Sequence, residues 1–284
     1  MTVDLAQLSQ WVGRSERRTD RVTPVPVAAL SATLDRDDPV PRDGDPLPPL
    51  WHWLYFLPLT RRSEVGPDGH ALRGGFLPPV PLPRRMWAGS RIRFLHPLRV
   101  GDAIERVSTI ESVDAKQGRS GELVFVVVRH EISAGGVAAI HEWHDIVYRD
   151  TPRADETPPP AKPAPADPAW RRDVVPDDVL LFRYSALTFN GHRIHYDRRY
   201  VTGVEGYPGL VVHGPLLATL LIDLLREHRP SAKVATFEFR ALRPVFDAAP
   251  FAVCGQPASG GGEVRLWAQD AGASLAMDAT ATLR

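Results

Sequence analysis

Two stretches of the chain repeat the same order of apolar and polar positions. Each begins with an apolar segment that ends near a proline, followed by an aspartate in a short turn. A glycine then opens a strand pair, a glycine-containing turn closes it, and a β-rich stretch ends the block. These features lie at residues 92–98, Asp102, 121–125, 133–136 and 137–147 in the first half, and at residues 239–245, Asp247, 262–266, 270–272 and 273–283 in the second. The repetition predicts two related β-rich units.

One candidate helix precedes each block. Residues 215–228 are apolar around most of a helical circumference, apart from a narrow polar stripe of Thr219, Asp223 and Glu227, so we expect a buried helix there. The counterpart in the first half is the aromatic run at residues 50–57, which prolines bound on both sides. A helix followed by an antiparallel sheet that wraps it, twice over, predicts an α+β fold of the double hot-dog kind. Other α+β layouts share this order of elements.

A segment rich in proline and alanine at residues 151–168 divides the chain. Its low complexity is unsuited to a packed core and is typical of a linker. We therefore expect an N-terminal unit at residues 1–150 and a C-terminal unit at residues 169–284.

Composition narrows the classes of function. The 284 residues carry 34 basic and 34 acidic side chains, so no overall field favours nucleic acid or an anionic membrane. The single cysteine, Cys254, excludes an internal disulfide framework and lies in an apolar run that predicts a buried strand. We expect no signal peptide at the N-terminus, and residues 210–225 are too short and too polar to cross a membrane, so a cytoplasmic protein is predicted.

The densest cluster of chemically capable side chains lies at residues 184–197, shortly before residues 211–215, where the second helix is expected to begin. This pairing resembles the MaoC-like, type-2 (R-specific) enoyl-CoA hydratases, in which the motif Gly-Asp-x-Asn-Pro-hydrophobic-His is followed by a His-Gly pair. By this resemblance, His195 is the catalytic histidine and Gly214 is the glycine whose N–H holds the thioester oxygen. Asn190 stands where that family has its catalytic aspartate.

The resemblance is closer to one branch, the mesaconyl-CoA and itaconyl-CoA hydratases with the 3-hydroxyacyl-thioester dehydratases. Their motif Thr-Phe-Asn-x-His-Arg-Ile-His-Tyr-Asp fits residues 187–197, and residues 51–57 and 83–89 also look like that branch. The resemblance implies a double hot-dog whose C-terminal half builds the active site, while the N-terminal half, a degenerate copy, shapes the acyl pocket. It also implies a CoA or acyl-carrier thioester substrate and no metal or redox cofactor, and it leaves a homodimer open.

The implied chemistry is the reversible addition of water to a 2-enoyl thioester, which places negative charge on the carbonyl oxygen. Free N–H groups at a helix N-terminus attract that charge, and Gly214 lets the oxygen approach the backbone closely. His195 suits the general acid/base, because histidine has the side-chain pKa nearest to neutrality. Asn190 cannot titrate, so we expect it to orient the water or the imidazole. His192 or Asp197 would then supply the missing ionisable group.

Further residues are candidates for binding the substrate. They are His192, Arg193, Asp197, His213, Arg85 and Trp51. One of Arg84, Arg85 and Arg193 is expected to pair with the second carboxylate of a dicarboxylic acyl-CoA such as mesaconyl-CoA. The aromatic run that begins at Trp51 is expected to form a wall for the acyl chain.

Several alternatives compete with this interpretation. A zinc site of His192, His195 and His213 is disfavoured, because no carboxylate or thiolate with zinc spacing accompanies them. His141 and His144 are interpreted as structural, since positions three apart on a strand point to opposite faces. A hot-dog thioesterase generally needs a carboxylate near the scissile carbonyl, and the missing aspartate weakens that option. A non-catalytic acyl-thioester binding protein stays open for the same reason.

Overall fold

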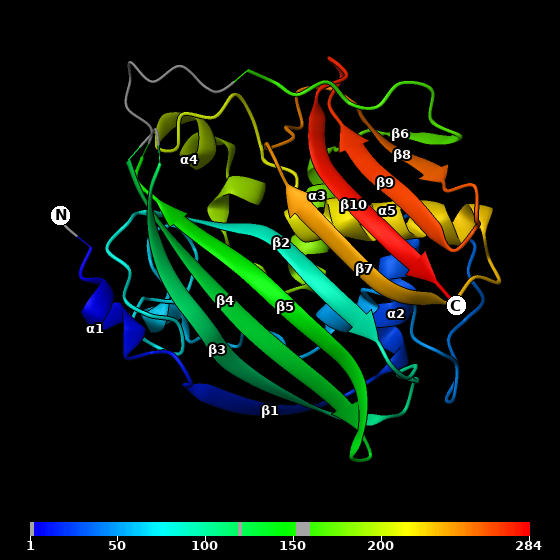
Figure 1. Cartoon of the computed structure of the whole chain (residues 1–284), viewed down its shortest axis with the longest axis horizontal. Helices are drawn as coiled ribbons and strands as arrows, with labels where there is room; N and C mark the ends of the chain where they lie inside the picture. Colours follow the sequence, from blue (N-terminus) through cyan, green and yellow to red (C-terminus); the bar gives the residue numbers. More distant parts are fainter. Residues whose placement is uncertain (1–2, 119–120, 152–159) are drawn as a thin grey trace.

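The computed structural model describes residues 3–118, 121–151 and 160–284 (Figure 1). Within them, strands of both halves form one antiparallel ten-stranded sheet in the order β1-β3-β4-β5-β2-β7-β10-β9-β8-β6. The first five in sequence are β1 (Ser15–Arg21), β2 (Arg84–Phe94), β3 (Ala103–Gly118), β4 (Gly121–Ala134) and β5 (Val137–Arg149). The others are β6 (Trp170–Val174), β7 (Val234–Ala241), β8 (Phe251–Pro257), β9 (Glu263–Gln269) and β10 (Leu275–Leu283).

The two halves meet where β2 pairs with β7, in the middle of the sheet. Ser90 lies opposite Phe239 and Ile92 opposite Phe237 in this register. A Cβ atom at Gly89 would overlap the carbonyl oxygen of Phe239, so the close approach of the two backbones requires glycine at this position. All strands from the first half therefore lie on one side of this junction, and all from the second half lie on the other.

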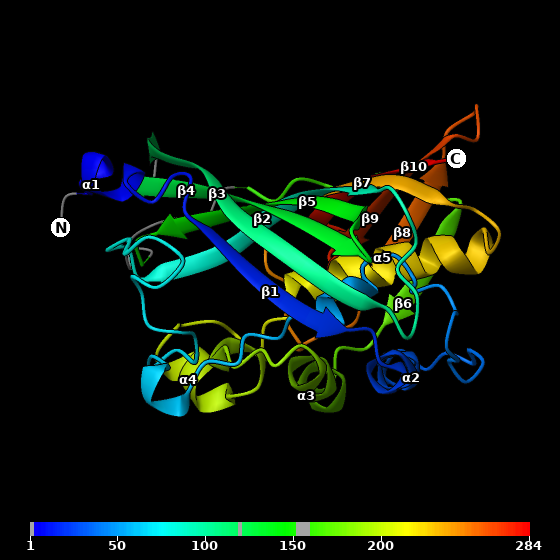
Figure 2. The same ribbon diagram turned by 90° about the horizontal axis from the view of Figure 1, so that it is seen from below.

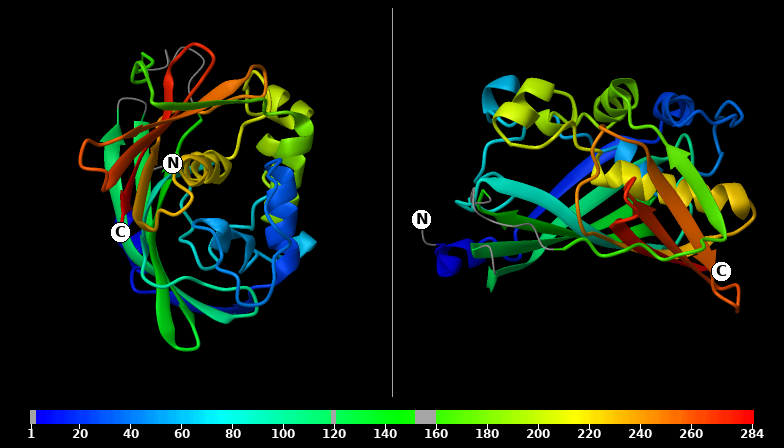
Figure 3. Two further views of the ribbon diagram at one scale, coloured as in Figure 1. Left: turned by 90° about the vertical axis from the view of Figure 1, so that its right-hand side faces the viewer. Right: turned by 90° about the horizontal axis from the view of Figure 1, so that it is seen from above.

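The helices lie on the concave side of the sheet. Helix α5 rests against the sheet, and α2, α3 and α4 form an outer row beyond it (Figures 2 and 3). The described helices are α1 (Leu5–Ser9), α2 (Pro24–Thr33), α3 (Asp178–Leu187), α4 (Arg198–Gly203) and α5 (Gly214–His228), with the 3₁₀ turns η1 (Trp51–Leu54), η2 (Arg62–Glu64) and η3 (Arg193–His195). None of them has the length and apolar character needed to cross a membrane.

Helix α5 matches the helix predicted at residues 215–228. Pro215 occupies its first turn, and every residue from Leu216 to Leu225 is buried. Because burying one leucine side chain contributes roughly 2 kcal/mol, this helix is a major source of core stability. The predicted polar stripe is also engaged: Asp223 is fully buried and forms ion pairs with Arg36, Arg172 and Arg226. Arg36 comes from the first half, so this buried carboxylate also joins the two halves.

The prediction of a helix at residues 50–57 is wrong. Only Trp51–Leu54 forms a single 3₁₀ turn, and Leu50 and Phe56 have left-handed backbones with φ of 72° and 57°. Eight residues between two prolines are too few for a stable helix, because the residue before a proline avoids helical angles. Aromatic side chains fill the core there instead, and the Tyr55 hydroxyl donates to the carbonyl of Thr23. The longest described helix of the first half is α2, which the hydrophobic pattern did not reveal.

The predicted hairpins are confirmed. Ala134 pairs with Val137 across the turn between β4 and β5, and β9 and β10 pair through the second predicted turn. Of the expected linker, residues 152–159 lie outside the described residues. The part that follows runs beside the start of β10, where the N–H of Ala164 donates to the carbonyl of Ala273.

Candidate active site

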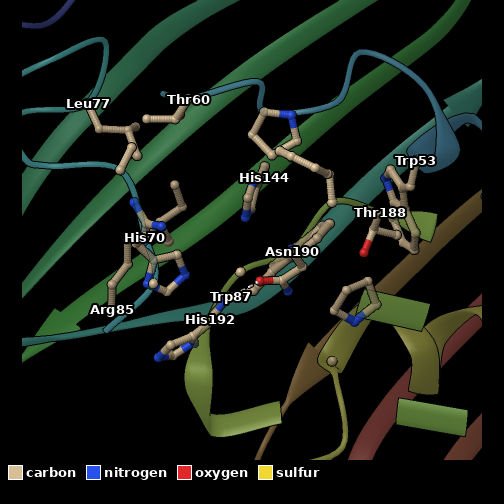
Figure 4. Close-up of a pocket in the computed structure, with 18 of the residues that line it drawn as sticks. Trp53, Thr60, His70, Leu77, Arg85, Trp87, His144, Thr188, Asn190 and His192 are labelled. Atoms are coloured by element: carbon tan, nitrogen blue, oxygen red, sulfur yellow. Dashed lines mark hydrogen bonds between the residues drawn. The ribbon is translucent and has the colours of Figure 1, made fainter. Parts of the chain in front are cut away.

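A cavity of about 1470 Å³ opens between the two halves. Its walls come from residues 52–78 and strands β2, β4 and β5 of the first half, and from residues 184–196 and the start of α5 in the second. Figure 4 shows side chains of both halves around it. Of the predicted site residues, it is bordered by His195, Asn190, Gly214, His192 and Arg85.

His195 is buried at the end of η3 and borders this cavity. Its Nδ1 lies 2.7 Å from the carbonyl oxygen of Val211. Since a carbonyl can only accept, Nδ1 carries the proton and Nε2 keeps a free lone pair. Burial lowers the pKa of His195 to about 4, although the bond to Val211 opposes the shift, so the ring is neutral near pH 7. This state makes Nε2 a proton acceptor.

Gly214 is the first residue of α5 and borders the same cavity. Its N–H belongs to the first helical turn, which has no intrahelical carbonyl to bond. A Cβ atom at this position would meet no heavy atom within 4 Å, so the space beside it is open. Val211 fixes this helix start relative to the histidine, because its N–H donates to Ile194 at 2.9 Å and its carbonyl accepts from His195. An acceptor imidazole and an unbonded amide thus border one cavity.

Asn190 and His192 form the turn that precedes His195. Asn190 Oδ1 accepts the N–H of His192 at 3.0 Å, so the amide oxygen is turned toward its own loop. The His192 ring is close to two others, with centroids 4.0 Å from that of His70 and 5.5 Å from that of His195. Burial and the charges of both neighbours lower the pKa of His192 to about 2, so it is neutral near pH 7. Neither residue supplies the negative charge of the aspartate that the family motif contains.

Arg193 and Asp197 lie outside the cavity lining and hold the loop together. The guanidinium of Arg193 donates to Asp197 at 2.8 and 3.0 Å and to the carbonyl of Pro67 at 2.9 Å, and it covers the ring of Tyr200. Asp197 also caps α4 by accepting the N–H of Tyr200. The prediction that these two residues contact the substrate is therefore not met by their positions.

His213 and Trp51 are also set back from the cavity. His213 is fully buried, stacks on His195 at 3.7 Å and bonds Ser185 Oγ at 2.8 Å, so it supports the ring in front of it. Trp51 is buried in the core. The expected aromatic wall is made by Trp53 and Trp87 instead, with ring centroids 5.1 Å apart (Figure 4).

The three candidate arginines differ in their partners. Arg84 is paired with Glu205 at 3.2 Å and Arg193 is paired with Asp197, whereas Arg85 borders the cavity. Within the described part of the chain, no carboxylate lies within ion-pair distance of Arg85. Its charge lowers the pKa of His144 and that of His192, which places the guanidinium near both rings. Arg85 is thus the arginine available to a ligand.

A second polar cluster, which the sequence analysis missed, lies in the first half around Glu142. This buried carboxylate accepts from Trp53 and Ser90 and lies 3.1 Å from His52 Nε2. Burial alone would raise the pKa of Glu142, but His52 and its neighbours lower it to about 2. His144, two residues after Glu142 on β5, borders the cavity. A purely structural role, as interpreted from the sequence, therefore does not describe its position fully. Alternation along the strand places Glu142 and His144 on one face, and this spacing was the available signal.

The structure also places Asp68 and His70, which the sequence analysis missed, beside the motif. His70 borders the cavity, and its Nδ1 lies 3.0 Å from Asp68 Oδ2. In the described ranges, Asp68, His70 and His192 form the one group whose ligand atoms, all within 4.8 Å of one another, could hold a metal ion. The zinc trio considered from the sequence, His192, His195 and His213, does not form such a group among the described residues.

A family model described as hydroxyacyl-thioester dehydratase type 2 matches residues 50–247. The mesaconyl-C(4)-CoA hydratase of Chloroflexus aurantiacus is 48% identical over 273 residues, which cover 96% of either chain. The crystal structure of a MaoC-like dehydratase from Phytophthora capsici has a TM-score of 0.68 at 12% identity, covering 99% of this chain and 98% of that one.

A Mycobacterium tuberculosis protein described as having a double hotdog fold has a TM-score of 0.58 at 13% identity, with 96% of both chains covered. These structural likenesses confirm the predicted fold class, an α+β double hot-dog. They do so although the first half has an aromatic 3₁₀ turn where a helix was predicted.

Proposed function

Because the chain belongs to the hydroxyacyl-thioester dehydratase type 2 family, we propose that it catalyses the reversible addition of water to a 2-enoyl thioester carried on coenzyme A. Membership also confirms the resemblance inferred from the motif at residues 187–197. The observation that carries the proposal is geometric: the Nε2 lone pair of His195 and the free N–H of Gly214 border one cavity and are linked through Val211.

In the hydration direction, His195 Nε2 takes a proton from water as the water oxygen bonds to Cβ of the substrate. The π electrons shift to the thioester oxygen, where the N–H of Gly214 and the positive end of the α5 dipole stabilise the enolate. The enolate then returns its electron pair to Cα, which takes the proton back from His195. Low basicity of the buried imidazole favours this return, since the imidazolium is poorly solvated there.

We further propose that the acyl group carries a second carboxylate, as in mesaconyl-CoA. Two observations support this: the 48% identical relative is named as a mesaconyl-C(4)-CoA hydratase, and Arg85 borders the cavity without a carboxylate partner among the described residues. A guanidinium in a partly desolvated wall binds a carboxylate through two parallel hydrogen bonds.

Hydration is tested by following the absorbance of the conjugated enoyl thioester, together with release of free thiol. For wild type, we expect the absorbance to fall while the thioester stays intact. Cleavage of the thioester, seen as release of free thiol, would identify a thioesterase instead. His195→Ala is expected to reduce kcat by at least about 10²-fold. A His195→Ala enzyme with wild-type turnover would remove the assigned general base, and a wild type that binds the thioester without turnover would indicate a non-catalytic binder.

Arg85→Gln tests the substrate class. With mesaconyl-CoA, kcat/KM is expected to fall by about 10²-fold, because a hydrogen-bonded charge pair contributes about 2–3 kcal/mol. With crotonyl-CoA, which has no second carboxylate, it should change by less than about threefold. Arg91→Gln is the matched control, since Arg91 lies on the same strand and pairs with Asp145 on the exposed face. Equal losses on both substrates would refute the carboxylate contact.

The proposed reaction transfers one proton and forms one carbon–oxygen bond, so it requires no redox cofactor. The roles given to His195 and Gly214 require no metal either, and dialysis against a chelator is expected to leave turnover unchanged. A cytoplasmic location and a homodimer complete the proposal. Cell fractionation and analytical ultracentrifugation test these two points.

A further inference from the structure

A loop of the first half lies against the catalytic motif of the second. Gly69 and Gly191 are in backbone contact, and a Cβ atom at Gly69 would overlap the carbonyl oxygen of Gly191. The N–H of Arg193 donates to the carbonyl of Asp68 at 2.9 Å, and its guanidinium donates to Pro67. These bonds fix the loop at residues 66–70 relative to the motif, although the two segments are more than 100 residues apart in sequence.

This loop carries an imidazole–carboxylate pair. His70 Nδ1 lies 3.0 Å from Asp68 Oδ2, and the N–H of His70 donates to Asp68 Oδ1 at 3.0 Å. Burial opposes ionisation of Asp68, but the hydrogen bonds from His70 outweigh it and hold the pKa of this carboxyl below its usual range. An ionised carboxylate can only accept, so Nδ1 of His70 carries its proton and Nε2 keeps a lone pair. Burial also lowers the pKa of His70, so the ring is neutral near pH 7.

His70 borders the cavity next to the other candidate residues. Its ring centroid lies 4.0 Å from that of His192 (Figure 4), and in its protonated form it is close enough to lower the pKa of His195. In contrast, the oxygen of Asn190 already accepts the N–H of His192. Two acceptors are needed to hold both hydrogens of an attacking water, and His195 provides only one. The motif itself therefore has no carboxylate at the position that a family aspartate would fill.

We propose that His70 is a second catalytic residue, whose Nε2 accepts the other O–H of the attacking water, and that Asp68 is a positioning residue that fixes its tautomer. The inference rests on the proposed hydration. One proton of the water goes to His195 and then to Cα, as described above. The other stays on the oxygen, hydrogen-bonded to His70, and becomes the proton of the product hydroxyl. Water is added, and no other atom or electron is required.

Four variants test this role: His70→Ala, His70→Gln, Asp68→Asn and the control His141→Gln. His141 lies on β5 outside the cavity lining, near Glu131. His70→Ala is expected to lower kcat by about 10²-fold with KM changed by less than about threefold. His70→Gln should recover part of that loss because its amide oxygen can accept from water. Asp68→Asn should give an intermediate kcat, and His141→Gln should match wild type.

Thermal unfolding of each variant accompanies the kinetics, so that only variants with wild-type Tm are compared. Wild-type kcat in His70→Ala, while His195→Ala is inactive, would overturn the role of His70 and leave the proposed hydration intact. Absence of hydration in wild type would instead refute the proposed function. Activity that a chelator abolishes and zinc restores would also overturn the inference, in favour of a metal held by Asp68, His70 and His192.

Discussion

Acidification should destabilise this protein strongly between pH 7 and pH 5. Burial lowers the pKa of four histidines: to about 2 for His192, to about 3 for His130, and to about 4 for His144 and His195. The pKa of the buried His213 is shifted in the same direction. In the unfolded chain the same side chains titrate near 6.5. Below that pH the unfolded state therefore binds protons that the folded state does not, so stability is lost as the pH falls from about 6.5 toward 4.

The magnitude follows from these shifts. For one histidine with an unfolded pKa of 6.5 and a folded pKa of 4 or less, the free energy of unfolding falls by about 2 kcal/mol between pH 7 and pH 5. Four such groups together give roughly 8 kcal/mol, which is comparable to the whole stability of a typical domain. The lowered pKa of Glu142 acts in the same direction, but only below the ordinary range of a carboxyl group.

Urea unfolding at half-unit steps between pH 7.5 and pH 5 measures this effect. Below pH 6, the free energy of unfolding should fall by roughly 5 kcal/mol per pH unit, about 1.4 kcal/mol for each histidine. His130→Gln removes one titrating group, so the slope should decrease by about 1.4 kcal/mol per pH unit, whatever the stability of the variant at pH 7. A wild-type slope of about 1.4 kcal/mol per pH unit or less would refute the conclusion that these rings are neutral when folded.

Three substitutions give further predictions. Asp223→Asn should lower the free energy of unfolding by about 3–5 kcal/mol in urea titrations, because it leaves three arginines around a buried site without their carboxylate; a loss below about 1 kcal/mol would contradict this. Gly89→Ala should lower the Tm measured by calorimetry, since its Cβ would force β2 away from Phe239, and an unchanged Tm would be inconsistent with the close backbone contact. Gly214→Ala should leave Tm unchanged but reduce kcat by about tenfold or more, because a methyl group beside the amide obstructs the thioester oxygen; full activity would argue against that binding mode.

The parts of the fold that the sequence predicted are those determined by local signals. Glycine-containing turns identify the β4–β5 and β9–β10 hairpins, and the leucine-rich pattern after Gly214 identifies α5. The failure at residues 50–57 has a local cause as well, since the apolar run was recognised but its flanking prolines were given too little weight. Helix α2 escaped detection because its apolar residues are not gathered on one face.

The candidate site divides in the same way. His195 belongs to the motif at residues 187–197 and Gly214 follows that motif in sequence. The structure brings both residues to one cavity. His70 is placed by the contact of Gly69 with Gly191, a tertiary contact for which one sequence gives no signal. The partner of Arg84, Glu205, was hidden for the same reason, whereas Asp197, the partner of Arg193, lies only four residues further along the chain. The local sequence pattern thus indicated where the active site lies, and long-range packing determines which other side chains border it.

The pairing of β2 with β7 within a single polypeptide has an evolutionary consequence. In a symmetric dimer of identical subunits, every mutation appears in both copies at once, so a change that enlarges one binding wall also alters the other. Covalent fusion removes this constraint. Here the second half has a long central helix, whereas the first half has an aromatic 3₁₀ turn, and both halves line the cavity between them. Selection can therefore adjust ligand capacity in one copy without disturbing reactivity in the other.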